Sequence, residues 1–86
     1  MLEQARALLD ARPGDALAKL DAHAAEFPSG QLAAERELLA VRALAKLGRV
    51  SEARTRGEAL VARSRGSPYE SRVRALLAAL PAEAPP

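Results

Sequence analysis

Residues 44–53 read Leu-Ala-Lys-Leu-Gly-Arg-Val-Ser-Glu-Ala, and this stretch decides the fold class. Gly48 follows a helical run and suits the left-handed backbone conformation that commonly ends a helix. Ser51 is placed to cap the N-terminus of a following helix. The stretch therefore predicts two helices, over about 31–47 and 52–64, joined by a tight turn.

The composition of the whole chain favours helices over sheets. Of 86 residues, 21 are Ala and 14 are Leu, whereas the strand-favouring residues are four Val, one Thr, one Tyr and one Phe, with no Ile. Ala and Leu are strong helix formers, and β-branched and aromatic residues are the usual strand formers. We therefore expect an all-α protein with a single domain, since 86 residues are too few for two.

Turn signals divide the rest of the chain into three more helices. Pro and Gly residues interrupt the apolar periodicity at 12–15, 27–30 and 65–66. Asp15 is expected to cap the second helix, and Ser67, followed by Pro and Glu, to form a capping box before the last. The predicted helices span about 2–11, 16–27, 31–47, 52–64 and 68–80. Such short connections place successive helices antiparallel and in contact. Residues 1–80 then form one helical domain, and the Pro/Ala-rich residues 81–86 a disordered tail.

The helix pairs repeat along the chain. Ala16 and Ala53, each at the start of the second helix of a pair, lie 37 residues apart, and the turn residues Ser29 and Ser67 lie 38 apart. A two-helix unit of about this length is typical of tetratricopeptide repeats (TPR), and residues 44–60 resemble that family most closely. The resemblance implies two TPR-like helical hairpins plus a C-terminal capping helix, which is a fragment of an α-solenoid.

Residues 27–77 also resemble the repeats of bacterial cell-envelope proteins. The resemblance lies in Phe-Pro-Ser-Gly at 27–30, in the Leu-Gly-Arg turn at 47–49 and in Gly-Ser-Pro-Tyr at 66–69. It implies a part of a larger bacterial assembly or regulatory protein. It favours the envelope or periplasm over the cytoplasm, and nothing else in the chain bears on the compartment.

Three features depart from the family pattern. Glu37 stands where a large aromatic residue is usual, Gly57 and a run of Arg replace bulky residues in the second helix, and Arg65 replaces a proline. The last helix is expected to cover the open end of the second hairpin, whereas the first hairpin has no such cover. Its Ala-rich outer face either is polar enough to be exposed or packs on more protein, such as a second copy.

Residues that could carry catalysis or bind a metal are scarce. The chain has no Cys, and His23 is its one His, so no second His stands at metal-ligand spacing. No hydroxyl residue has a neighbouring base, and Glu35 and Glu37 point to different faces of a helix. No apolar run approaches the roughly 18 residues needed to cross a bilayer. We therefore expect no enzyme, no cofactor, no bound metal and no membrane insertion, and we expect His23 on the surface.

The candidate binding site is a groove along the predicted 31–47 helix. In the family that the chain resembles, the first helix of each pair lines the concave side, where peptides or partner helices dock. The residues on that stripe are Glu35, Leu38, Arg42, Ala45 and Lys46. Arg42 and Lys46 are four residues apart, so two like charges share one face, and a carboxylate on a partner would relieve their repulsion. The alternative is a solvated basic face without a partner.

These features lead to one main functional hypothesis and two alternatives. The main hypothesis is a protein–protein interaction scaffold, whose groove takes a peptide or partner helix of unknown identity. The first alternative is a structural homo-oligomerisation domain, a homodimer formed through the first hairpin. The second is binding of an anionic polymer or nucleic acid by the six Arg between positions 54 and 74. The net charge is only +2 and a single aromatic residue, Tyr69, stands within that set, which favours a distributed salt-bridge surface instead.

Overall fold

The computed structural model describes residues 2–27 and 32–81. Over those residues the chain forms five α-helices and no strand, which confirms the all-α prediction. The helices are α1 (Leu2–Leu8), α2 (Pro13–Glu26), α3 (Ala33–Lys46), α4 (Val50–Arg63) and α5 (Pro68–Ala78). The expected turn at 28–30 and most of the expected tail lie outside the described residues.

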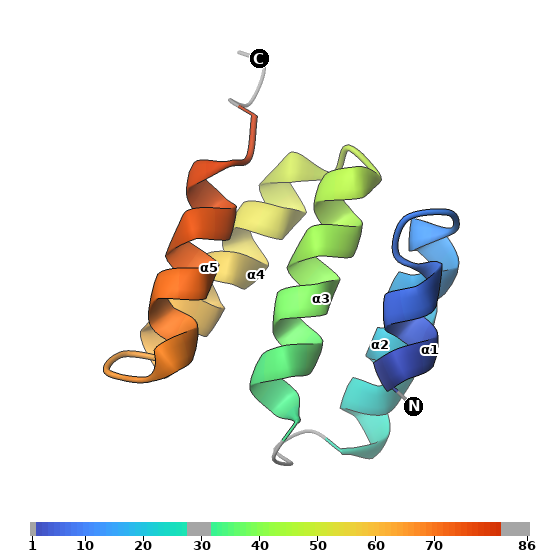
Figure 1. Ribbon diagram of the computed structural model, residues 1–86, viewed down its shortest axis with the longest axis horizontal. Helices are drawn as coiled ribbons and strands as arrows, with labels where there is room; N and C mark the ends of the chain where they lie inside the picture. Colours follow the sequence, from blue (N-terminus) through green and yellow to red (C-terminus); the bar gives the residue numbers. More distant parts are fainter. Residues whose placement is uncertain (1, 28–31, 82–86) are drawn as a thin grey trace.

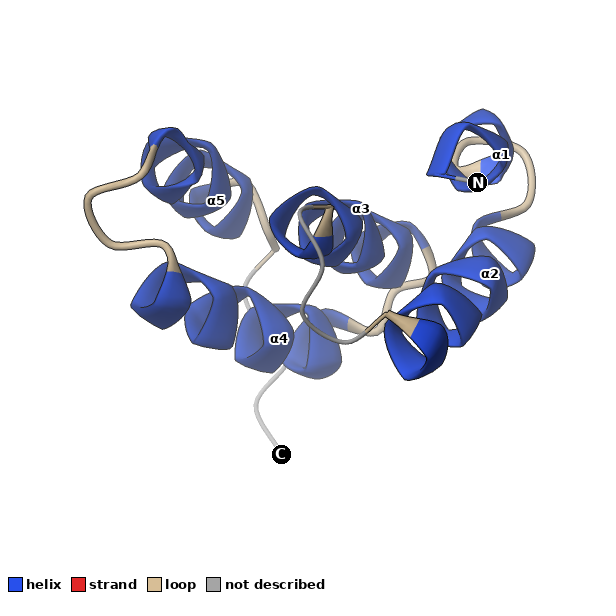
Figure 2. Ribbon diagram, turned by 90° about the horizontal axis from the view of Figure 1, so that it is seen from below, coloured by secondary structure: helices blue, strands red, loops and turns tan. Residues whose placement is uncertain are grey.

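The helices form two layers, and α3 is the central element. Figure 2 shows α1, α3 and α5 in one layer and α2 and α4 in the other. Figure 1 shows the chain turning back after each helix. Each helix contacts the next, and α3 also contacts α1 and α5, so all four other helices pack on it. That the helix pairs are repeats of one TPR-like unit stays a prediction.

The turn chemistry is confirmed at two helix ends. Gly48 has a φ of 77°, the left-handed conformation expected of it. At the start of α5 the Ser67 hydroxyl accepts a hydrogen bond from the Tyr69 backbone N–H at 3.2 Å. Glu70 accepts one from the Gly66 backbone N–H at 3.0 Å. Ser67 therefore caps the helix as predicted, but neither bond is that of a standard capping box, which would join the Ser67 hydroxyl to the Glu70 N–H and the Glu70 carboxylate to the Ser67 N–H.

The expected caps at Asp15 and Ser51 are wrong. The N-cap residues of α2 and α4 are Arg12 and Arg49, and neither makes a side-chain capping bond. Pro13 has a φ suited to the first helical position and its missing N–H costs nothing there, so α2 begins two residues before Asp15. The glycine turn before α4 reverses the chain so tightly that the helix resumes directly after Arg49.

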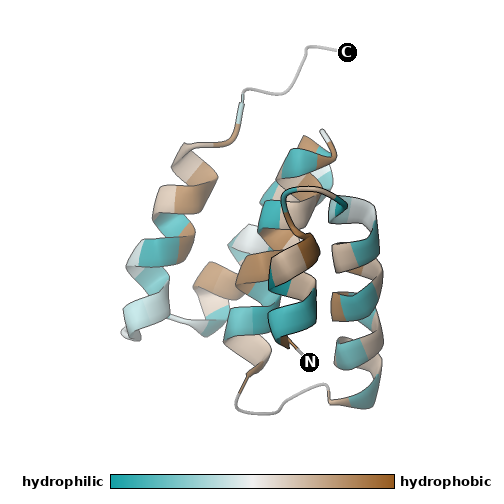
Figure 3. Ribbon diagram, turned by 45° about the vertical axis from the view of Figure 1, so that its right-hand side comes forward, coloured by the Kyte–Doolittle hydropathy of each residue, from teal (hydrophilic) through white to brown (hydrophobic). Residues whose placement is uncertain are grey.

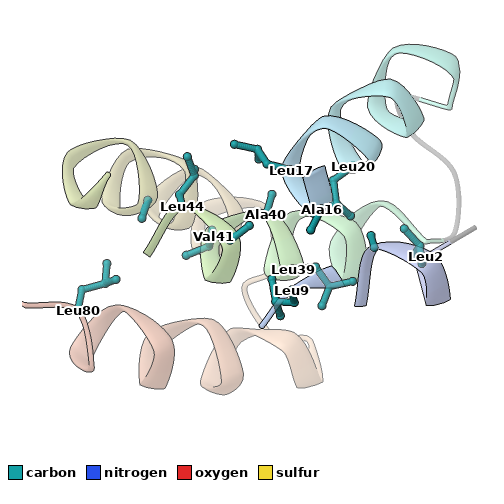
Figure 4. Close-up of a cluster of buried hydrophobic side chains, with 13 residues drawn as sticks. Leu2, Leu9, Ala16, Leu17, Leu20, Leu39, Ala40, Val41, Leu44 and Leu80 are labelled. Carbon is teal, nitrogen blue, oxygen red and sulfur yellow. The ribbon is translucent and has the colours of Figure 1, made fainter. Parts of the chain in front are cut away.

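The core is centred on α3 and contains two clusters of buried hydrophobic side chains. The larger joins α1, α2 and α3 and reaches α4 and the residues after α5. Figure 4 labels Leu2, Leu9, Ala16, Leu17, Leu20, Leu39, Ala40, Val41, Leu44 and Leu80 from it. The smaller joins α3, α4 and α5 through Leu38, Leu60 and Val73. Hydrophobic and hydrophilic segments alternate along the helices (Figure 3), as expected where one face of each is buried.

Phe27 lies outside this core, although its spacing predicts otherwise. It continues the stripe of Ala16 and Leu20, both fully buried, but its own side chain is 45% exposed. The reason is that α2 ends at Glu26, so Phe27 has left the helical path that would carry it inward. Its ring instead packs at the helix end against His23, with 5.2 Å between ring centroids.

Gly57 is the position at which α5 comes closest to α4. It is buried within the expected inward stripe of α4, between Ala53 and Leu60. A Cβ built on Gly57 would lie 2.6 Å from Cδ2 and 3.2 Å from Cγ of Leu77. An alanine at this position would therefore require the Leu77 side chain to move, and this close contact accounts for a glycine inside a helix, where it is unfavourable by about 0.5–1 kcal/mol relative to alanine.

We predict that Gly57→Ala lowers the free energy of unfolding in the native chain and raises it in a chain that lacks the Leu77 side chain. In the native chain the clash with Leu77 outweighs the gain in helix propensity, and the free energy of unfolding falls by about 1 kcal/mol. In a Leu77→Ala chain the clash is gone, so the same substitution raises stability by about 0.5–1 kcal/mol. Urea denaturation followed by circular dichroism measures both.

Gly14→Ala is the matched control for Gly57→Ala in the two backgrounds. A Cβ on Gly14 meets only Cδ2 of Leu47 at 4.0 Å, an ordinary contact. It should therefore stabilise the chain in both backgrounds. An equal gain from Gly57→Ala in both backgrounds would show that the close approach to Leu77 does not constrain the fold.

Candidate functional site

A groove lies between α3 and α5 and consists of two connected hollows of about 400 and 260 Å³. The first is lined by Leu38, Arg42, Arg72, Ala75 and Leu76. The second is lined by Arg42, Ala45, Lys46, Leu76, Ala79, Leu80 and Pro81. Arg42 and Leu76 belong to both, so the hollows form one depression, which we call the α3–α5 groove.

Four of the five predicted site residues line this groove. Leu38, Arg42, Ala45 and Lys46 are all on the face of α3 that meets α5. Leu38 is 4% exposed and packs in the smaller core cluster, so it forms the floor of the groove. Glu35 does not line either hollow. It lies one turn before Leu38 and contacts charged groups of the two neighbouring helices.

Glu35 bridges α1 and α5 across α3. Its Oε1 accepts a hydrogen bond from Nη2 of Arg6 at 2.6 Å, and its Oε2 lies 3.7 Å from Nη1 of Arg72. The Arg72 guanidinium also lies over the ring of Tyr69, 5.3 Å from its centroid. The expectation that Glu35 binds a partner therefore gives way to a role inside the chain, because its carboxylate already has two cations.

The two cations expected to select a carboxylate differ in their surroundings. Nζ of Lys46 lies 2.8 Å from Oδ1 of Asp10, which follows α1. The hydrogen bond and charge of Lys46, helped by the charge of Arg42, lower the pKa of Asp10 below its usual value. Arg42 is exposed, and no carboxylate of the described residues lies within ion-pair distance of it. Of the two, Arg42 is the cation that a partner would meet.

A buried ionic network lies on the other side of α3. It is not among the features predicted from the sequence. Nε of Arg36 donates to Glu37 at 3.0 Å, and Nε of Arg56 donates to the same carboxylate at 2.8 Å. Nη2 of Arg56 also lies 3.0 Å from Oδ1 of Asp21 on α2. Arg36 and Glu37 are 3% and 7% exposed. The network thus joins α2, α3 and α4 through charged groups.

The sequence does contain a signal for the pair of Glu37 and Arg56. Both residues depart from the family pattern, one by replacing an aromatic and the other by belonging to the Arg run. They stand eleven residues before and eight after Gly48, on the two helices that a hairpin turning at that glycine packs together. Their opposite charges on two packed helices are compatible with an ion pair.

The prediction that His23 is a surface residue is wrong. His23 is 7% exposed, since it continues the inward stripe of α2 one turn after Leu20. Its Nδ1 lies 3.4 Å from Nη1 of Arg36, which also donates to the backbone oxygen of Phe27 at 2.7 Å. Arginine only donates, so Nδ1 of His23 is the acceptor in this contact. Over the described residues no group of three His, Cys, Asp or Glu side chains is arranged to hold a metal ion.

Comparison with known proteins adds no relative. The chain has no significant match to a protein-family model, to a curated protein or to a solved structure. Among the described residues, none of the helices has the length and apolar character needed to cross a membrane.

The ionic network makes stability depend on pH. Burial raises the pKa of Glu37, but the hydrogen bonds and charges of Arg56 and Arg36 outweigh it, so this pKa lies below the ordinary 4.5. A carboxyl whose pKa is lowered by folding contributes stability above its unfolded pKa. That contribution is lost as pH falls through the folded value.

We predict that Glu37→Gln lowers the free energy of unfolding at pH 7 by about 3 kcal/mol, because it removes the carboxylate charge next to the buried guanidinium of Arg36, whereas the half-buried Arg56 keeps Asp21. The difference between native chain and variant should shrink below about pH 4, as Glu37 becomes protonated in the native chain. Denaturant titrations from pH 3 to 7 measure this.

Glu52→Gln is the control, because Glu52 forms an exposed pair with Arg49 at 2.6 Å and should cost less than about 1 kcal/mol. An NMR titration of the Glu37 carboxyl gives an independent reading. A midpoint above 4.5 would contradict the proposed dominance of the arginines over burial.

Proposed function

We propose that the chain is a non-catalytic protein–protein interaction module that binds a peptide or partner helix in the α3–α5 groove. The observation that carries the proposal is the environment of Arg42. Its guanidinium is exposed, it has no carboxylate partner among the described residues, and it stands between two mostly apolar hollows. A charged donor beside apolar side chains is a typical arrangement for an orienting contact at the edge of a hydrophobic interface.

Affinity and selectivity would come from different groups in this groove. Leu76 is partly buried and Leu80 is 9% exposed, and both contribute to the groove surface. Apolar side chains of a partner would gain free energy by covering them. Arg42 would then select partners that place a carboxylate between those apolar contacts, whereas Lys46 contributes less because Asp10 already neutralises it.

The layer arrangement supports a module of the TPR-like kind. α1, α3 and α5 share one layer, and the groove lies between two members of it, as expected if the first helix of each pair lines a binding surface (Figure 2). The Arg residues of α4 and α5 support a polymer-binding role less well. Arg56, Arg72 and Arg74 each lie within ion-pair distance of a carboxylate of the same chain.

We predict that reversing the charge of Arg42 reverses the charge of the peptides that the module selects. A random peptide library displayed on phage is panned against the native chain and against Arg42→Glu. Peptides from the native chain should be enriched in Asp and Glu, and those from the variant in Lys and Arg. The helical circular dichroism spectrum and the melting temperature should change little, because Arg42 is exposed.

Arg63→Glu is the matched control. Arg63 is also an exposed arginine, in the last turn of α4 and outside the residues that line the groove. It makes the same change in net charge, so its selected peptides should match those of the native chain. If all three chains select peptides of the same charge, Arg42 does not determine the charge of the bound peptide. Light scattering of the native chain distinguishes a monomer from the homodimer hypothesis.

A further inference from the structure

The α3–α5 groove has a regular spacing that a partner must match. On α3 the groove is lined by Leu38, Arg42, Ala45 and Lys46, and the first three stand at positions i, i+4 and i+7 of one helix face. At 1.5 Å of rise per residue, Leu38 and Ala45 are about 10 Å apart along the axis, with Arg42 between them. Along α3 the groove therefore offers an apolar floor at Leu38, a cation at Arg42 and a methyl group at Ala45, and Arg72 of α5 also lines the hollow at Leu38.

The charges along the groove differ between its ends and its middle. At the α3 N-terminal end Glu35 is shared between Arg6 and Arg72, one carboxylate for two cations, and at the other end Asp10 pairs with Lys46. A partner carboxylate placed at either end would compete with a carboxylate that the chain already supplies. A carboxylate placed at Arg42 would meet a cation that has no such competitor within ion-pair distance in the described part of the chain.

The apolar spacing distinguishes a helical partner from an extended one. Side chains on one face of an extended strand recur every two residues, at about 7 or 13 Å, and neither spacing matches 10 Å. Side chains at i and i+7 of a helix lie on one face about 10 Å apart, with i+3 and i+4 between them. Small side chains of Ala45, Ala75 and Ala79 along the groove leave room for such a helix to approach closely.

We propose that the α3–α5 groove binds an amphipathic helix that carries apolar side chains at positions i and i+7 and one carboxylate at i+4. Read in the opposite direction, the same pattern places the carboxylate at i+3, a shift of about 1.5 Å that a Glu side chain can absorb. The proposal rests on the proposed function and adds to it the conformation of the partner and the order of its side chains.

Four synthetic helical peptides test this pattern. All are sixteen residues long, Ala- and Gln-based, blocked at both ends and labelled with fluorescein. The first has leucines at the fifth and twelfth positions and Glu at the ninth. The second replaces that Glu with Gln, the third replaces it with Lys, and the fourth keeps the Glu but moves the second leucine to the fourteenth position, on another face. Fluorescence anisotropy measures their affinities for the native chain, Arg42→Glu and Arg63→Glu.

We expect the first peptide to bind the native chain and Arg63→Glu about tenfold more tightly than the second or the fourth, the size of one charge-assisted hydrogen bond. On Arg42→Glu, the peptide with Lys should bind more tightly than the peptide with Glu. Equal binding of the first and second peptides overturns the central carboxylate, and equal binding of the first and fourth overturns the spacing.

The outcomes separate this proposal from the proposed function. If no designed helix binds but the phage selections still respond to Arg42, the groove binds partners and only the helical pattern is wrong. If neither responds, both proposals fail. If light scattering shows a dimer that Arg42→Glu converts to a monomer, a second copy of the chain occupies the groove, and the designed helices are not its ligands.

Discussion

The shared carboxylate of Glu37 is the interaction that ties α2 and α4 to the central helix α3. α3 packs against all four neighbours, and its face toward α2 and α4 places this charge inside the protein. A buried charge of this kind is stable only with partners, and Arg36 and Arg56 supply them. Asp21 then extends the network to α2. The relative position of the two helices in the second layer is therefore tied to a set of directed hydrogen bonds, which tolerate less displacement than apolar contacts do.

Much of the fold could be predicted because it depends on local backbone chemistry and on periodicity. Gly48 and Ser67 act at the helix ends where their conformational and capping preferences place them. Many residues of the predicted stripes are buried as their spacing predicts, among them Leu2, Ala5, Ala16, Leu20, Ala53 and Leu60. The failures at Asp15 and Ser51 have a shared cause. Several residues near a turn can serve as a cap, and the exact path of the turn, which decides among them, is set by tertiary packing.

In the candidate site, too, helical spacing predicts some features, whereas others depend on tertiary packing. Leu38, Arg42 and Ala45 could be placed on one face from helical spacing alone, and the structure brings them to one groove. The roles of Glu35 and Lys46 could not be predicted, because their partners Arg6 and Asp10 come from the first eleven residues and reach them only through the packing of α1 on α3. His23 is buried because it stands one turn after Leu20 on the inward stripe of α2. This position outweighs the tendency of histidine to be exposed.

Glu35 connects two helices of the layer that contains the groove. Its carboxylate holds a cation from α1 on one side and a cation from α5 on the other, so it acts as a tie between the two outermost helices of one layer. Spreading those helices stretches one of the two ion pairs, and both involve exposed arginines that dissolved ions can screen. Salt is therefore expected to weaken the tie between α1 and α5, because it screens both ion pairs.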